Sequence, residues 1–141
     1  MKASDISGRQ GHILLVDDDS ALGGYLSRVL RSGGFDVAYE LDASSALYRV
    51  KAEQWDLLMT DIELPGMSGL ELLERVREIA PDLPVAVLTG HPSVDYAISA
   101  LRGAAAEFLS KPISADDLLA KAAELIAAGR EARNKPKAGT P

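Results

Sequence analysis

The chain has 141 residues, of which 47% are hydrophobic, and its formal net charge at pH 7 is −6. This length suits one globular domain with a sizeable core, whereas an acidic chain lacks the clustered Lys and Arg that direct nucleic-acid binding requires. The absence of cysteine excludes disulfides and thiolate metal sites and fits a reducing compartment.

Neither a membrane span nor a secretion signal is expected from the sequence. No hydrophobic run approaches the roughly 18 residues that cross a bilayer. The opening segment MKASDISGRQGH lacks the hydrophobic stretch of a signal peptide. We therefore expect a cytoplasmic protein that makes no contact with membranes.

Hydrophobic runs and amphipathic segments alternate five times between residues 12 and 128, which we expect to form the folded domain. Strands are predicted over residues 12–16, 35–39, 57–60, 85–88 and 107–109. Helices are predicted over residues 20–31, 43–52, 70–79 and 94–101, and from 115 to about 128. This alternation predicts an α/β fold, a parallel sheet with helices on both faces. Right-handed crossovers limit it to a few doubly wound strand orders.

The two ends of the chain are expected to lie outside this domain. Residues 1–11 are polar, and we expect them to be flexible. Residues 129–141, GREARNKPKAGTP, are basic and poor in hydrophobic side chains. Such a composition predicts a linker or a disordered tail.

Four of the predicted strands are followed by residues that a phosphoryl-transfer site would need. Asp17–Asp19 follow the first strand, Asp61 the third and Thr89 the fourth, and Lys111 comes shortly after the fifth. Because ligands bind at the carboxyl ends of parallel strands, these side chains are expected to converge at one edge of the sheet. Each alone has an ordinary explanation as a turn, cap or surface residue, but their joint occurrence in this order favours a shared site.

The acids are expected to hold a metal ion. Asp61 should lie beside Asp17 and Asp18, because the third strand should neighbour the first in a doubly wound sheet of this size. Carboxylates within a few ångströms of one another repel unless a cation or a shared proton offsets their charge. Oxygen ligands without His or Cys suit a hard ion such as Mg²⁺. Asp19 or Ser20 is expected to cap the first helix.

With a metal ion in place, Asp61 is a candidate nucleophile toward phosphorus, since an aspartyl phosphate is a recognised covalent intermediate. The transferred phosphoryl group spreads negative charge over three equatorial oxygens. One oxygen would contact Mg²⁺, one the Lys111 ammonium, and one the Thr89 hydroxyl with nearby backbone N–H groups.

The stretches that carry these residues resemble the receiver domain of two-component response regulators. They are ILLVDDDSAL (13–22), LLMTDIELPGMSGLELL (57–73), VAVLTGH (85–91) and EFLSKPI (107–113). The resemblance extends from about His12 to about Ala128. It implies a flavodoxin-like, five-stranded parallel sheet of strand order 2-1-3-4-5 with five helices.

The resemblance assigns a role to each acid of the site. Asp61 would be the phosphoacceptor. Asp17 and Asp18 would hold Mg²⁺ together with Asp61 and the backbone carbonyl of Glu63. The side chains of Glu63 and His91 flank the site at positions that tune the lifetime of the phosphoryl group in the family. We therefore predict an effect of Glu63 on this lifetime, without assigning its direction.

The same resemblance implies a conformational switch. Thr89 and Lys111 would contact the phosphoryl group, with the Lys111–Pro112 peptide bond in the cis form. Phe108 takes the place of the family's switch aromatic, although it lacks the hydroxyl of the commoner Tyr. Switching would alter the face formed by the fourth helix, the last strand and the last helix. Ala104 stands where the family usually has glycine after the fourth helix, with Gly103 one residue earlier, so the end of that helix is expected to be affected.

The resemblance implies a signalling switch and not an enzyme with an external substrate. Its chemistry would be limited to self-phosphorylation and self-dephosphorylation. The phosphoryl donor would be a sensor histidine kinase or a histidine phosphotransfer protein. The signal would pass to an output domain or a partner protein, and activation often dimerises such domains.

Two alternatives remain open. A Mg²⁺-dependent phosphatase of the haloacid-dehalogenase type would use Asp17 as nucleophile and Asp19 as acid and base. The chain is short for such an enzyme, however, and Asp61 would have no role in it. The other alternative is a receiver-like interaction module that signals without phosphorylation, which the complete set of site residues disfavours.

Overall fold

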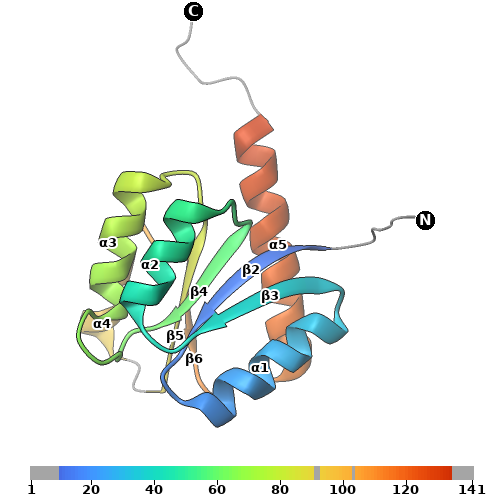
Figure 1. Cartoon of the computed structure of the whole chain (residues 1–141), viewed down its shortest axis with the longest axis horizontal. Helices are drawn as coiled ribbons and strands as arrows, with labels where there is room; N and C mark the ends of the chain where they lie inside the picture. Colours follow the sequence, from blue (N-terminus) through green and yellow to red (C-terminus); the bar gives the residue numbers. More distant parts are fainter. Residues whose placement is uncertain (1–9, 91–92, 103, 135–141) are drawn as a thin grey trace, which may run out of the picture.

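The alternating strands and helices predicted from the sequence are found in the computed structural model, which describes residues 10–90, 93–102 and 104–134 (Figure 1). The strands are β2 (Gly11–Val16), β3 (Phe35–Glu40), β4 (Leu57–Asp61), β5 (Val85–Thr89) and β6 (Glu107–Ser110). The helices are α1 (Ser20–Ser32), α2 (Ala43–Ala52), α3 (Gly69–Ile79), α4 (Val94–Arg102) and α5 (Ala115–Asn134). No helix within these ranges is long and hydrophobic enough to cross a membrane.

Over the described residues, the strands form one parallel sheet in the order β3-β2-β4-β5-β6. Counted along the chain this order is 2-1-3-4-5, which confirms the expected doubly wound fold. In the register of the sheet, Val16 lies opposite Thr60, and Asp61 lies opposite Leu88. The carboxyl ends of β2, β4 and β5 therefore meet at one edge.

Helices cover both faces of the sheet, because the strand side chains alternate between two hydrophobic clusters. Ile13 and Leu15 of β2 pack in the cluster that includes residues of α1 and α5. Leu14 and Val16 pack in the other cluster, which includes residues of α2, α3 and α4. All four side chains are buried. A strand that is buried on both faces explains why residues 13–16 read as a continuous hydrophobic run.

Side-chain caps determine where three of the helices begin. The Asp19 carboxylate accepts the N–H of Leu22 at 3.1 Å, which makes Asp19 the cap of α1. Asp42 caps α2, and Ser68 caps α3. Of the two candidates in the sequence, Asp19 and Ser20, the structure thus selects Asp19.

The last helix is longer than the sequence predicted. We expected it to end near Ala128, but α5 continues to Asn134. Two arginines of this extra length pair with Asp56, which directly precedes β4: Arg130 at 3.4 Å and Arg133 at 3.6 Å. The prediction was wrong because the Asp56 carboxylate lies more than 70 residues away in the chain and becomes a neighbour of the two arginines only on folding. Residues 135–141 lie outside the described part.

The amino-terminal end of the folded part also starts slightly earlier than predicted. Gly11 belongs to β2 and lies opposite Phe35. Just before it, the N–H of Gln10 donates to the Gly34 carbonyl at 2.9 Å. The assignment of residues 1–9 to a flexible segment stays a prediction, because they lie outside the described residues.

α4 is followed by a residue in the left-handed conformation, Ala104, whose φ is 67°. Residues other than glycine adopt this conformation at a cost, because their Cβ approaches the following carbonyl. The next N–H, from Ala105, donates to the Ala100 carbonyl at 2.9 Å. This bond is typical of a helix end that favours glycine at the left-handed position. Gly103 lies outside the described residues.

Candidate functional site

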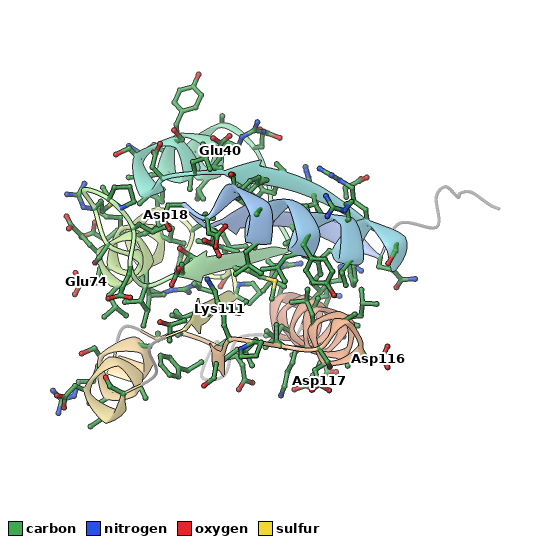
Figure 2. The ribbon with its side chains drawn as sticks, turned by 90° about the horizontal axis from the view of Figure 1, so that it is seen from below. Asp18, Glu40, Glu74, Lys111, Asp116 and Asp117 are labelled. Carbon is green, nitrogen blue, oxygen red and sulfur yellow. The ribbon has the colours of Figure 1, made fainter. Side chains whose placement is uncertain are left out.

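The residues proposed from the sequence converge at the carboxyl edge of the sheet. Asp17 follows β2, Asp61 and Thr89 end β4 and β5, and Lys111 directly follows β6. Figure 2 shows Lys111 extending from the segment after β6 toward the region of Asp18, whereas Glu74, Asp116 and Asp117 lie on other parts of the surface. The expected convergence of acids and amine is therefore found in the structure.

Three carboxylates form the negative part of the site. Oxygen atoms of Asp17, Asp18 and Asp61 all lie within 4.8 Å of one another. Asp17 is only 1% exposed, whereas Asp18 is exposed to solvent. The cluster thus combines one buried, one partly buried and one solvent-facing carboxylate.

The Lys111 ammonium bridges two of these acids. Its Nζ lies 2.7 Å from Asp17 Oδ2 and 3.1 Å from Asp61 Oδ2. Burial by itself lowers the pKa of Lys111, but the hydrogen bonds and charges of Asp17 and Asp61 outweigh that effect and raise it. The N–H of Lys111 donates to the Thr89 carbonyl at 2.8 Å, and the Lys111–Pro112 bond is cis, as the resemblance implied.

Hydrogen bonds to β3 and within the loop hold the Asp17–Asp19 segment that carries two of the acids. The N–H of Asp17 donates to the Glu40 carbonyl at 3.1 Å, and the N–H of Asp19 donates to Asp17 Oδ1 at 2.9 Å. The hydroxyl of Tyr39 donates to the Asp17 carbonyl at 2.6 Å and lies 3.3 Å from the Asp19 carbonyl. Sequence reasoning missed Tyr39, because its partners are backbone carbonyls of the loop after β2, more than 19 residues earlier in the chain.

Gly69 is a second residue near the site whose contact was not predicted from the sequence. A Cβ at this position would lie 1.9 Å from the Asp61 carbonyl oxygen, and the N–H of Gly69 donates to Ile62 at 2.8 Å. The start of α3 therefore packs directly against the backbone of Asp61. Only glycine permits this approach, which holds the end of β4 in place.

The donor set of the cluster fits a hard divalent cation. Its side chains offer carboxylate oxygens and neither sulfur nor imidazole, which suits Mg²⁺. Glu63, whose carbonyl was the expected backbone ligand, lies in the adjacent loop, where its N–H donates to Asp61 Oδ1 at 3.4 Å. Asp18 and Glu63 also line a shallow hollow beside the cluster. One ammonium cannot balance three carboxylates, so a further cation is electrostatically favourable there.

The residues expected to switch lie on the neighbouring strands. Thr89 is fully buried, and Phe108 is partly buried against the cluster that covers the α2, α3 and α4 face. Phe108 lies opposite Val87, and Ser110 lies opposite Thr89. Because strand side chains alternate with a period of two, Thr89 and Phe108 point to the same face. His91 lies outside the described residues.

A larger surface hollow lies at the opposite edge of the sheet. It has a volume of about 760 Å³ and includes His12, Trp55, Asp56 and Arg133. His12 lies at the start of β2, Trp55 and Asp56 precede β4, and Arg133 lies near the end of α5. Ligands of such sheets instead bind beyond the carboxyl ends of the strands. Chemistry and burial therefore locate the site at the acid cluster, although the larger hollow is elsewhere.

Comparison with known proteins gives the same picture over most of the chain. Residues 13–123 match the response regulator receiver domain family. The chain is 36% identical over 122 residues to the transcriptional regulatory protein ZraR of Klebsiella oxytoca, and 35% identical over 111 residues to the transcriptional regulatory protein FixJ of Bradyrhizobium diazoefficiens. The alignments cover 86% and 79% of this chain but only 28% and 54% of those relatives, so the chain spans about a quarter to half of their length.

Solved structures share the fold. A CheY-like response regulator receiver domain protein from Methanospirillum hungatei is 30% identical, with a TM-score of 0.83 over 86% of this chain and 97% of that one. NtrX from Brucella abortus, in complex with ATP, is 32% identical, with the same TM-score of 0.83 over 88% of this chain and 28% of its own. The family match covers residues 13–123, which include all five strands of the sheet and the acids at its carboxyl edge. The chain therefore belongs to the response regulator receiver domain family.

Proposed function

We propose that this receiver domain is a switch in which Asp61 accepts a phosphoryl group from a phosphohistidine. The observation that carries the proposal is the Lys111 ammonium, which lies 3.1 Å from Asp61 Oδ2 at the carboxyl edge of the sheet. A cation held there is placed to stabilise negative charge on a group that is transferred to Asp61.

The transfer exchanges one bond for another. A carboxylate oxygen of Asp61 attacks phosphorus, the bond between phosphorus and the histidine nitrogen breaks, and that nitrogen keeps the electron pair. The product is an acyl phosphate on Asp61. Water later attacks phosphorus and restores the carboxylate with release of inorganic phosphate. In the acyl phosphate, Lys111 would pair with one phosphoryl oxygen and the Thr89 hydroxyl with another.

Mg²⁺ would be held by the carboxylates of Asp17, Asp18 and Asp61, with the backbone carbonyl of Glu63 as a further ligand. When bound, the ion offsets the repulsion among the acids and withdraws charge from the phosphoryl oxygens. The side chain of Glu63 is proposed to tune the lifetime of the acyl phosphate, because it follows Asp61 by two residues and borders the open hollow.

The conformational part of the proposal links the site to a surface. Thr89 would move toward the phosphoryl group, and Phe108, on the same face of the sheet, would turn into the space beside it. The face formed by α4, β6 and α5 would then favour one of two packings. Two supporting observations are the burial of Thr89 and the partial burial of Phe108.

The partners are proposed from this chemistry. The donor would be a sensor histidine kinase or a histidine phosphotransfer protein, since both present a phosphohistidine. The recipient of the signal would be an output domain or a separate protein, with homodimerisation of the phosphorylated form as one route. No external substrate is turned over in this proposal.

The haloacid-dehalogenase alternative finds no support in the geometry. Its nucleophile would be Asp17, yet that carboxylate is buried and engaged by Lys111 and by the N–H of Asp19. Asp61 would have no role in such an enzyme, although its carboxylate belongs to the cluster and pairs with Lys111. The phosphorylation-independent module stays an outcome of the experiment below.

The test is the intact mass of the protein after incubation with acetyl phosphate and Mg²⁺. We expect one phosphoryl group on the wild type and on Asp82→Asn, an exposed acid beside the hollow at the opposite edge of the sheet, and none on Asp61→Asn. Hydroxylamine, which cleaves acyl phosphates, should remove the label. Equal labelling of Asp61→Asn would contradict the proposed acceptor. No labelling of the folded wild type, by acetyl phosphate or by phosphohistidine proteins, would favour the module that signals without phosphate.

A further inference from the structure

Tyr39 connects the second strand in the chain to the loop that carries the acids. In the register of the sheet, Tyr39 of β3 lies opposite Leu15 of β2, two residues before Asp17. Its hydroxyl donates to the Asp17 carbonyl at 2.6 Å, and the Asp19 carbonyl is 3.3 Å away. One side chain thus contacts the backbone on both sides of Asp18.

The ring of Tyr39 packs against α1 at Gly23, which has no side chain to obstruct it. A Cβ built on Gly23 would lie 2.2 Å from Tyr39 Cζ and 2.3 Å from its hydroxyl oxygen. Glycine inside a helix costs about 1 kcal/mol relative to alanine, so this residue weakens α1 while it admits the ring. The neighbouring Gly24 has no such contact, since its Cβ would meet only Arg28 Nη1 at 3.6 Å.

The hydroxyl of Tyr39 is one of several groups that hold the loop of the acids. A tyrosine hydroxyl can donate one hydrogen bond to a backbone carbonyl. The N–H groups of the Asp17–Asp19 loop donate to Glu40 and to Asp17 itself, and the Asp19 carbonyl also accepts the N–H of Gly23 at 2.8 Å. Tyr39 is the side chain that donates to the Asp17 carbonyl, at 2.6 Å.

We propose that Tyr39 is a positioning residue for Mg²⁺ binding, because its hydroxyl holds the Asp17–Asp19 backbone in the arrangement that keeps the carboxylates together. The inference rests on the proposed function, since it concerns the affinity of that same acid cluster for Mg²⁺. Carboxylate oxygens within 4.8 Å repel one another before a cation arrives. A loop that is held against this repulsion needs no rearrangement on binding, and the ion binds more tightly as a result.

The test compares the dissociation constants of Mg²⁺ for Tyr39→Phe and the wild type, measured by calorimetry and by the amide shifts of residues 17–19. The substitution keeps the ring against Gly23 and removes only the donor. We expect the dissociation constant to rise roughly three- to tenfold, the factor that corresponds to the net worth of one hydrogen bond. Tyr48→Phe is the matched control, because Tyr48 is 73% exposed on α2, and it should leave the affinity unchanged.

A second pair of variants tests the same bond without touching the tyrosine. Gly23→Ala must displace the ring and should weaken Mg²⁺ binding, whereas Gly24→Ala should not. Labelling with acetyl phosphate gives a further readout. For Tyr39→Phe, the Mg²⁺ concentration at half-maximal labelling should rise by the same factor, and the rate at saturating Mg²⁺ should approach that of the wild type.

Each outcome decides the inference. If Tyr39→Phe loses stability but binds Mg²⁺ with unchanged affinity, the hydroxyl has only a structural role and the inference is wrong. If the wild type binds Mg²⁺ but never accepts a phosphoryl group, the proposed function fails, while the affinities of the variants still decide the role of Tyr39. If the folded wild type does not bind Mg²⁺ at all, the inference is overturned as well.

Discussion

The balance of charge at the site depends on single residues. Lys111 places one ammonium against the buried carboxylate of Asp17 and the partly buried carboxylate of Asp61. Its side chain is 14% exposed, so solvent screens these contacts less than it screens surface pairs. Removing one partner of such a contact leaves a buried charge unpaired, which costs more than an exposed ion pair contributes.

We predict that Lys111→Met lowers the free energy of unfolding by about 1–3 kcal/mol at pH 7 without Mg²⁺. The loss should shrink when Mg²⁺ is added, because the ion supplies the missing positive charge. Lys121→Met is the control: Lys121 pairs with Glu107 at 3.4 Å near the surface, and solvent screens such a pair so that it contributes little to stability. Urea unfolding of both variants measures the effect, and equal losses would contradict it.

The same variant gives a prediction about pH. The pKa of Lys111 is raised above its ordinary value of 10.5, so the folded state binds this proton more tightly than the unfolded state. The stabilisation is therefore fully present below the ordinary pKa and is lost as the pH rises through the raised one. The difference in unfolding free energy between wild type and Lys111→Met should be constant from neutral pH to the ordinary pKa and decrease above it.

At the level of whole elements, helix ends show how local chemistry meets tertiary contacts. α1, α2 and α3 begin at residues whose side chains cap them. α4 instead ends before Ala104, which adopts the left-handed conformation with a φ of 67°. α5 is extended by ion pairs of Arg130 and Arg133 with Asp56. The helix caps could be predicted from local sequence. The extension of α5 could not, because it depends on Asp56, at the edge of the sheet opposite the acid cluster.

We predict that Ala104→Gly stabilises the domain by about 1 kcal/mol, because glycine adopts the left-handed conformation without a Cβ clash. The urea midpoint should rise with an unchanged slope. Ala106→Gly is the matched control, since Ala106 is also exposed and near the same turn but is not left-handed. It should not stabilise the domain. A gain in both variants, or in neither, would show that the backbone at Ala104 is not strained.

At the scale of the whole molecule, the sheet order brings distant strand ends together. β2 lies between β3 and β4, so Tyr39, Asp17 and Asp61 become neighbours although they are far apart in sequence. The site therefore exists only in the folded state. An ion that binds there stabilises the native state and not the unfolded chain.

We predict that Mg²⁺ raises the melting temperature of the wild type. At a Mg²⁺ concentration of one hundred times the dissociation constant, the free energy of unfolding should rise by about 2.7 kcal/mol. Asp18→Asn should lose most of this gain without much cost in the metal-free protein, because Asp18 is exposed. Glu74→Gln, an exposed acid on α3 away from the cluster (Figure 2), should keep the full gain. Thermal unfolding with and without Mg²⁺ measures the effect. An equal gain in both variants would place the ion elsewhere.

Much of the fold and of the site could be predicted because the relevant signals are local. Hydrophobic runs end at Asp17, Asp61 and Thr89, and a sheet of parallel strands places such ends side by side. The extension of α5 could not be predicted, because Arg130 and Arg133 look like a solvated charged segment until Asp56 is beside them. The structure brings the described site residues together, but all of their proposed roles stay predictions: phosphoacceptor for Asp61, Mg²⁺ ligands for Asp17, Asp18, Asp61 and Glu63, phosphoryl contacts for Thr89 and Lys111, the switch for Phe108, and lifetime for Glu63 and His91.

The sequence by itself determined the order of strands and helices and the residue types at the carboxyl ends of the strands. These follow from hydrophobic periodicity and from turn chemistry, which act over a few residues. Only the tertiary structure decided that Tyr39 contacts the Asp17–Asp19 loop, that Gly23 and Gly69 admit close approaches, and that Lys111 bridges two acids. Contacts of this kind depend on distances across the sheet, and separation along the chain does not encode those distances.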